Sequence, residues 1–187
     1  MGNIWLTSDF HFCHDREFVW KARGFESVEE MNQAIVDRFK SKIQPEDTLY
    51  ILGDCMMNDN EKAERYLAQI PGKKIFIRGN HDNNPRVEIY KKYTDEEVKW
   101  ADVIKYKGKS IYLSHHPTIT MNMGELHNLT FNFFGHTHQT ENLYGNYFNM
   151  YHVGVDSHDC YPVYIDDAIE VCKIEMERYK NAFGGEL

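Results

Sequence analysis

The sequence predicts an α/β fold in which two mixed sheets pack face to face between helices, a four-layer α/β/β/α sandwich. Apolar strands alternate with amphipathic helices in the first half of the chain, and strands dominate the second half. The 187 residues are close to the length of one domain of about 150 residues, and no linker or repeat interrupts them. We therefore expect a single domain over residues 1–187.

The first half of the chain carries clear signals for both element types. Residues 4–7 form a short apolar run that leads into a polar stretch, which is typical of a strand. Ser27 and Glu30 have the spacing of a capping box, and apolar residues follow every four positions from Met31. The elements expected here are strands at 4–7, 48–52 and 74–77, and helices that begin near 28 and near 63.

The second half is richer in strands. Residues 104–106 and 111–113 flank a lysine-glycine turn, which predicts a hairpin. Further strands are expected at 130–134, 147–155 and 162–165. Ile169, Cys172 and Met176 share one face of a closing helix.

Composition and charge indicate which binding partners and which cellular location to expect. The 21 basic and 29 acidic residues give a net charge of −8, which disfavours a surface that coats nucleic acid or anionic membrane. The sequence contains no run of 18 apolar residues, so a membrane span is not expected, and the N-terminus lacks a signal-peptide pattern. The four scattered cysteines are typical of reduced thiols, so we expect a cytoplasmic protein that is a monomer or a homodimer.

Five of the predicted strands run into short polar loops, and every loop carries side chains that can bind a metal. Strands of an α/β sheet bring their carboxyl ends to one edge, so these loops can converge on one pocket. Carboxylate, amide and imidazole ligands without thiolate suit ions such as manganese, iron, zinc or nickel. The side chains are Asp9, His11, Asp54, Asn80, His81, His115, His136 and His138.

This set is too large for one tetrahedral ion. It suits two ions that share a bridging carboxylate. Two ions about 3.5–4 Å apart can grip both the attacking and the leaving oxygen of a phosphoryl group, and they lower the pKa of bound water toward about 7.

The motifs, taken together and in order, resemble those of the calcineurin-like metallophosphoesterase superfamily, and the short chain looks most like its small stand-alone bacterial and phage phosphoesterases. They are Asp9-Phe10-His11, Gly53-Asp54, Gly79-Asn80-His81-Asp82, His115 and Gly135-His136-Thr137-His138. The resemblance implies two divalent ions, with Mn²⁺ expected and Fe, Ni, Zn or Mg left open. It implies that Asp9, His11 and His138 hold the first ion, that Asp54 bridges, and that Asn80, His115 and His136 complete the second.

The resemblance also implies a hydrolytic mechanism for a phosphomonoester or phosphodiester. A hydroxide that bridges the two ions would be the nucleophile. His81 would lie over the phosphoryl group and stabilise charge or protonate the leaving oxygen, with Asp82 as its orienting partner.

Substrate contacts are less well defined by the sequence. Arg78 and Arg23 are candidate phosphate clamps because guanidinium matches phosphate with two parallel hydrogen bonds, although each can instead pair with a carboxylate. His14 is a candidate for lining the pocket, or else a surface histidine. Residues 117–130, which include Met121 and Met123, are expected to form a specificity loop or lid.

Two other functions remain open at this point. A metal-dependent nuclease would use the same ligands, but the charge of −8 and the lack of a basic tract count against it. A non-catalytic scaffold or sensor would not need His81, which is present. The motifs of nucleotide-fuelled motors, dinucleotide-binding dehydrogenases, zinc proteases and serine esterases do not occur. The expected substrate is a small phosphoester.

Overall fold

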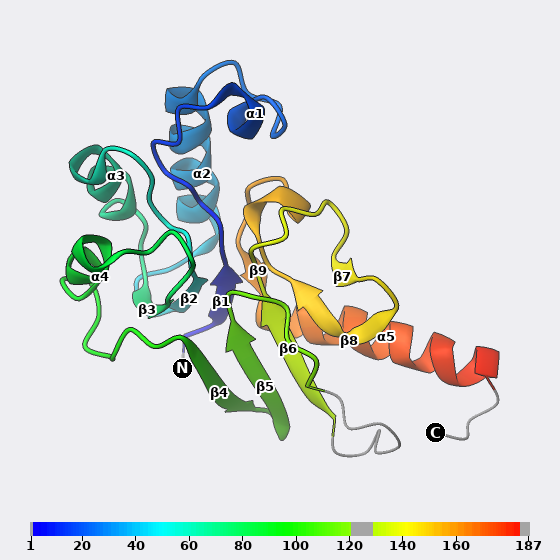
Figure 1. The fold of residues 1–187 in the computed structure, drawn as a ribbon. Coiled ribbons are helices and arrows are strands. Elements are labelled where there is room, and N and C mark those ends of the chain that lie inside the picture. Colours follow the sequence, from blue (N-terminus) through cyan, green and yellow to red (C-terminus); the bar gives the residue numbers. More distant parts are fainter. Residues whose placement is uncertain (1, 121–128, 184–187) are drawn as a thin grey trace.

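The computed structural model describes residues 2–120 and 129–183, and its centre is a pair of mixed β-sheets (Figure 1). The first sheet has the order β3-β2-β1-β9. Its strands are β1 (Ile4–Thr7), β2 (Thr48–Leu52), β3 (Lys73–Ile77) and β9 (Val163–Tyr164). β1 pairs in parallel with β2, and β2 with β3, whereas β9 runs antiparallel to β1. The three parallel strands therefore end at the same edge.

The second sheet has the order β4-β5-β6-β8-β7. Its strands are β4 (Ala101–Tyr106), β5 (Lys109–Ser114), β6 (Thr130–Phe134), β7 (Leu143–Tyr144) and β8 (Tyr147–His152). β4 and β5 form the predicted hairpin, while β5, β6 and β8 are parallel to one another. The carboxyl ends of β5 and β6 thus lie next to each other.

Helices cover the first sheet on the side away from the second sheet. They are α1 (Glu17–Trp20), α2 (Val28–Lys42), α3 (Asn60–Leu67) and α4 (Asn84–Tyr90). The side chains that cap α2, α3 and α4, which are Ser27, Asp59 and Asn83, each accept a hydrogen bond from the backbone three residues ahead. The apolar faces of these helices bury a core with β2 and β3.

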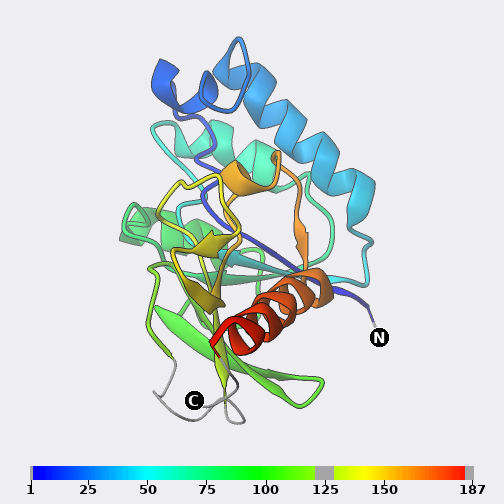
Figure 2. The same ribbon diagram turned by 90° about the vertical axis from the view of Figure 1, so that its right-hand side faces the viewer.

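A second apolar core lies between the two sheets. Leu6, Leu52 and Ile77 from the first sheet meet Leu113 and Phe133 from the second. The closing helix α5 (Ile165–Phe183) packs against β8, β9 and β1, and its first turns join this core. Figure 2 shows α5 (red) below and apart from α2 (blue). The expected architecture of two packed mixed sheets with helices is confirmed.

Some local expectations were wrong or lie outside the described residues. The strand expected over 147–155 ends at His152, and a short 3₁₀ helix, η2 (Val155–Ser157), follows. The elements α1, α4 and β7 are too short to give a periodic pattern and were not predicted. Residues 121–128 of the expected specificity loop are outside the described residues. Among the described helices, none has the length and apolarity needed to cross a membrane.

Candidate active site

The loops that follow the strands hold unusual backbone conformations. Left-handed φ angles are rare for residues other than glycine and cost on the order of 1–3 kcal/mol each, so they concentrate where a site requires them. Five of the seven candidate metal ligands have them: Asp9 (φ 58°), His11 (48°), Asp54 (53°), His136 (70°) and His138 (49°). Half of the ten described non-glycine residues with a positive φ are thus candidate metal ligands.

Two glycines allow these loops to approach one another closely. A Cβ atom at Gly79 would overlap the Asp54 carboxylate, and one at Gly135 would overlap the Ser8 and Asp9 side chains. The backbone of Gly79 instead donates to Asp82 at 2.8 Å. Both glycines are thus required by close approach at the site rather than by generic turns.

A first group of ligand atoms forms around Asp9, His11 and His138. His11 Nε2 lies 3.2 Å from His138 Nε2. Asp9 Oδ1 lies 3.7 Å from His11 Nε2 and 3.8 Å from His138 Nε2. Bonds of about 2.1 Å to one ion would put neighbouring ligand atoms about 3.0–3.4 Å apart, so small movements would close this group around an ion.

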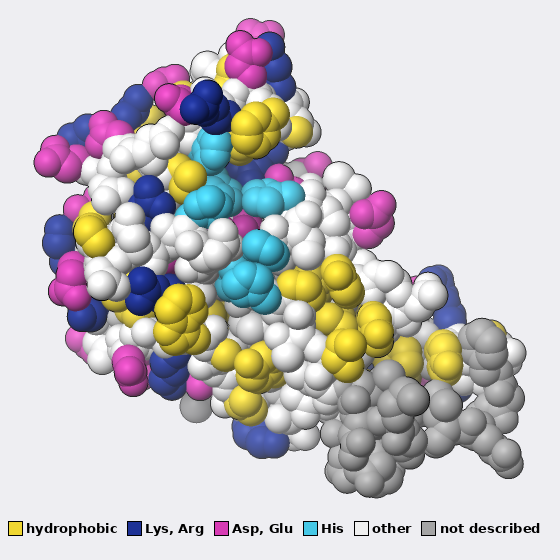
Figure 3. All heavy atoms as spheres, in the orientation of Figure 1, with side chains coloured by type: hydrophobic (Ala, Val, Ile, Leu, Met, Phe, Trp, Pro, Cys, Tyr) yellow, Lys and Arg dark blue, Asp and Glu magenta, His cyan; other side chains and the backbone are white. Residues whose placement is uncertain are grey.

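A second group forms around Asn80, His115 and His136. Asn80 Oδ1 lies 2.9 Å from both His115 Nε2 and His136 Nδ1. Asp54 Oδ2 lies 3.4 Å from His115 Nε2 and also 3.8 Å from His11 Nε2 of the first group. One carboxylate oxygen therefore faces both groups, a position from which it can bridge two ions. Figure 3 shows the histidines gathered in a band on this face.

The chemistry of the donor atoms fits bound cations. Asp9 Oδ1 is buried and has no hydrogen-bond partner among the described residues. His115 Nδ1 donates to the Leu52 carbonyl at 2.8 Å, which leaves its Nε2 facing the amide oxygen of Asn80 at 2.9 Å. Either a bound cation or a proton on His115 Nε2 satisfies this pair of atoms.

The pKa values of His115 and Asp54 also indicate that the site favours positive charge. Burial lowers the pKa of His115, but the Asp54 and Asp9 carboxylates outweigh it and raise this pKa to about 9. Burial raises the pKa of Asp54, yet His115 and His11 bring it below its usual value. The carboxylates therefore stay ionised, and in the metal-free protein a proton on His115 partly balances them.

The family comparison agrees with this geometry. A model described as the calcineurin-like phosphoesterase superfamily domain matches residues 3–150. The chain belongs to this superfamily. Phosphoester hydrolysis is the class of chemistry that the family name denotes.

The names of three similar proteins state no substrate. An uncharacterized protein of Methanocaldococcus jannaschii is 34% identical over 119 residues, which cover 63% of this chain and 60% of that protein. The Gene 66 protein of Mycobacterium phage L5 is 34% identical over 86 residues, covering 44% and 41%. The chain thus spans less than two thirds of these relatives. A protein of unknown function from Aquifex aeolicus, 28% identical, superposes with a TM-score of 0.71 over 91% of this chain and all of the other.

Arg23 does not serve the substrate role expected of it in this calcineurin-like domain. Its guanidinium is buried and forms an ion pair with Asp156 through Nε at 2.8 Å and Nη2 at 3.1 Å. It also donates to the carbonyls of Asp9 at 2.8 Å and Phe10 at 3.0 Å. Every donor direction toward a phosphate is thereby used within the protein.

Asp156 is a site residue that the sequence analysis missed. Its Oδ2 lies 2.9 Å from Nδ1 of His138, so it fixes the ring with Nε2 toward Asp9. Burial raises the pKa of Asp156, but His138 and Arg23 lower it well below its usual range. No spacing rule links positions 23, 138 and 156. The sequence signal at this position was the resemblance of Gly154-Val155-Asp156 to the family's closing strand region, which gave Asp156 no role.

We expect Asp156→Asn to weaken metal binding because His138 loses the carboxylate that orients it. Removing such a partner typically costs about 10- to 100-fold in metal affinity. Calorimetric titration of the metal-free protein with Mn²⁺ measures this loss, and Asp167→Asn on the exposed side of α5 is the matched control. Equal affinity in Asp156→Asn and the wild type would contradict the role.

Asp82 is not the orienting partner of His81 that was expected. Its carboxylate points into the protein, where Oδ2 accepts from the backbone of Asp54 at 2.9 Å and of Gly79 at 2.8 Å. Its Oδ1 accepts from the Tyr90 hydroxyl at 2.6 Å. Asp82 therefore ties the Asp54 loop to the Gly79 loop and positions the bridging carboxylate.

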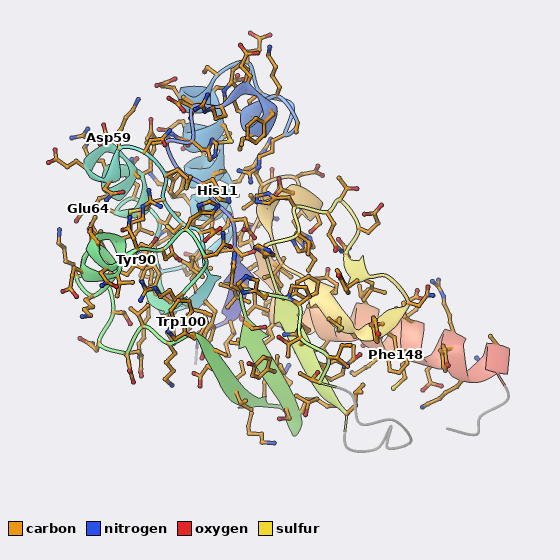
Figure 4. The ribbon with its side chains drawn as sticks, in the orientation of Figure 1. His11, Asp59, Glu64, Tyr90, Trp100 and Phe148 are labelled. Carbon is orange, nitrogen blue, oxygen red and sulfur yellow. The ribbon has the colours of Figure 1, made fainter. Side chains whose placement is uncertain are left out.

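Arg78 also differs from the expectation. Its guanidinium donates to the Asp82 carbonyl at 2.7 Å and to Asn84 Oδ1 at 2.9 Å, and it lies 4.6 Å from the Trp100 ring. Figure 4 shows Trp100 by the start of β4, well away from His11. Arg78 thus braces its own loop instead of facing the histidine band.

His81 and His14 lie where a substrate would pass. The His81 backbone donates to Asp54 Oδ1 at 2.9 Å, and its half-exposed ring has Nε2 at 3.9 Å from Asp54 Oδ2. Its ring centroid is 5.6 Å from that of His11. The half-buried His14 ring flanks His11 at the same distance. Both roles proposed from the sequence are compatible with these positions.

His152 lies behind the ligand loops and is held neutral. Its Nδ1 donates to Ser157 Oγ at 2.7 Å, because the hydroxyl proton goes to the Gly154 carbonyl, while Nε2 has no partner among the described residues. Burial lowers its pKa from 6.5 to about 4. A second proton would have no acceptor in this place.

The His152 pKa predicts a loss of stability in mild acid. The unfolded chain binds this proton below pH 6.5, whereas the folded protein resists it down to about pH 4. The contribution of neutral His152 to the free energy of unfolding is fully present above pH 6.5. It decreases by about 3 kcal/mol as the pH falls from 6.5 to about 4. Urea unfolding with EDTA at pH 7 and pH 4.5 measures it. His152→Gln should show a smaller decrease than the wild type, and an equal decrease would exclude His152 as the cause.

Proposed function

We propose that this chain is a dinuclear metal-dependent phosphoesterase that hydrolyses a small phosphomonoester or phosphodiester. The observation that carries the proposal is the position of Asp54 Oδ2, which faces His115 of one ligand group at 3.4 Å and His11 of the other at 3.8 Å. Two divalent ions, Mn²⁺ being our first choice, would supply an activated water at neutral pH and positive charge for the phosphoryl oxygens.

The protein's own residues divide the remaining work. Asp9, His11 and His138 would hold one ion, Asn80, His115 and His136 the other, and Asp54 both. His81 lies at the solvent side of Asp54, so it can donate a hydrogen bond to a phosphoryl oxygen and a proton to the leaving oxygen. His14 would line the same opening, while Arg23, Asp156 and Asp82 hold the loops in register.

The overall charge supports a small substrate over a nucleic acid. The chain carries a net charge of −8, and Arg23 and Arg78, the two candidate phosphate clamps, are used in internal contacts. A nuclease would show binding that weakens steeply with salt, because counterions are released from the backbone it covers. The four cysteines, all free and buried, fit the cytoplasmic location that forms part of this proposal.

Metal removal followed by reconstitution tests the proposal. The protein is demetallated, supplied with Mn²⁺, Ni²⁺, Zn²⁺ or Mg²⁺, and assayed on a phosphomonoester and a phosphodiester. We expect about two ions per chain and hydrolysis that depends on them, with the ratio of the two rates giving the ester class. Tight metal binding without turnover on either ester would argue for a sensor, and the absence of metal binding would refute the dinuclear site.

A further inference from the structure

Four side chains form a continuous row of ring contacts that leads from the candidate active site to the surface. The ring of His81 lies 5.6 Å from that of His11, with the planes at 73°. His11 lies 5.6 Å from His14 at 79°, and His14 lies 5.7 Å from Phe18 at 72°. These are edge-to-face contacts within the range that aromatic rings favour. The Phe18 ring is therefore only two such steps from a candidate metal ligand.

Phe18 is unusually exposed for its size. It is 72% exposed, more than any other large hydrophobic side chain among the described residues. Its neighbours in α1, Val19 and Trp20, pack against the core of the first sheet and its helices. The helix is thus anchored by these two side chains and presents the Phe18 ring to solvent beside His14.

The segment that carries the ring is held in place from both sides. The Cys13 backbone amide donates to Asn32 Oδ1 of α2 at 3.3 Å. Asn58 Nδ2 donates to the Cys13 carbonyl at 3.2 Å and to Asp15 Oδ1 at 2.7 Å. A ring on a fixed segment loses little conformational entropy when a ligand covers it, which favours binding.

A positive charge accompanies the ring. Arg16 is exposed, and its side chain has no ion-pair or hydrogen-bond partner among the described residues, whereas the Lys21 beside it is paired with Glu17 at 2.6 Å. Figure 3 shows a basic and a hydrophobic side chain next to the upper end of the histidine band. An imidazole, a guanidinium and an exposed ring thus occur within five residues, next to a candidate phosphate site.

We propose that the substrate's organic group carries a planar aromatic base, as in a nucleotide, and that this base stacks on Phe18 while the phosphoryl group lies at His81. Arg16 would then face a second anionic or polar group of the same ligand. This inference rests on the proposed phosphoesterase function and adds its substrate class. Stacking of a base on an aromatic side chain is lost on substitution by alanine, which we expect to raise KM about 5- to 100-fold.

Two substrates that differ only in the base test the proposal. The metal-loaded enzyme is assayed on adenosine 5′-monophosphate and ribose 5-phosphate, or on their methyl esters if the protein is a diesterase. We expect Phe18→Ala to raise KM for the adenosine compound with kcat nearly unchanged, and to leave the ribose compound unaffected. Phe18→Trp should restore the low KM. Ile174→Ala, at an exposed position on α5, should change neither.

The outcomes distinguish a failure of the base-stacking proposal from a failure of the proposed phosphoesterase function. A wild-type enzyme that shows no preference for the adenosine compound, or a Phe18→Ala variant that affects both compounds equally, would overturn the base platform. Turnover of no phosphoester at all would overturn the proposed function. In that case, calorimetric binding of the same two compounds to the metal-loaded wild type and Phe18→Ala still decides whether Phe18 recognises the base.

Discussion

Replacement of Asp54 by asparagine should abolish hydrolysis and reduce the metal content. The substitution keeps the shape of the side chain, and the new amide oxygen can still accept from the His81 backbone as Oδ1 does at 2.9 Å. It replaces Oδ2, the atom that faces both ligand groups, with an uncharged amide donor. Both groups lose a shared ligand, so we expect metal affinity to fall at least about 100-fold. That is the largest loss typical of removing a residue that only hydrogen-bonds to a metal ligand.

Metal analysis and initial rates on the reconstituted protein measure this effect. Glu61→Gln on α3 is a matched control, since it removes one exposed carboxylate elsewhere. A thermal unfolding curve establishes that the variant is folded. Undiminished turnover in Asp54→Asn would exclude a shared carboxylate from the reaction.

Replacement of His81 by alanine should lower kcat while the metal content stays near that of the wild type. The ring is 46% exposed at the mouth of the site, and its Nε2 lies beyond hydrogen-bond distance of Asp54. It is therefore free to face a substrate oxygen rather than needed to hold an ion. Loss of a general acid typically costs about 10²- to 10⁴-fold.

The leaving group gives a sharper form of the same test. An ester whose alcohol has a low pKa needs little help from an acid, so His81→Ala should impair a p-nitrophenyl ester less than an alkyl ester. His81→Gln, which keeps a hydrogen-bond donor but transfers no proton, should follow the alanine variant on the alkyl ester. Loss of metal in His81→Ala would make His81 a ligand instead.

The sequence predicted the strands and the convergence of the candidate site because both depend on local patterns. The strands at 4–7, 48–52 and 130–134 have the same bounds in the structure, since each is a short apolar run that ends in polar residues. The ligand candidates meet because parallel strands end at one edge. Periodicity and strand topology are thus sufficient for this level of description.

The roles of the charged residues around the ligands could not be predicted in the same way. Arg23 and Asp156 are 133 positions apart, and they meet because Arg23 donates to the Asp9 carbonyl while Val155, next to Asp156, donates to the Ser8 carbonyl. Asp82 follows His81 directly, yet its side chain turns inward to Tyr90. Side-chain direction in irregular loops depends on the backbone angles, and sequence spacing does not specify these.

The candidate ligands come from both sheets, with Asp54 following β2 and His115 following β5. The apolar layer formed by Leu52, Leu113 and Phe133 therefore sets the spacing between the two halves of the centre. Packed interiors transmit changes of a single methylene as small shifts. Substitutions such as Leu113→Val, remote from any reacting atom, thus offer a means of tuning the affinity for ions of different radius. We expect metal selectivity at the proposed centre to depend on the hydrophobic core as well as on the ligands.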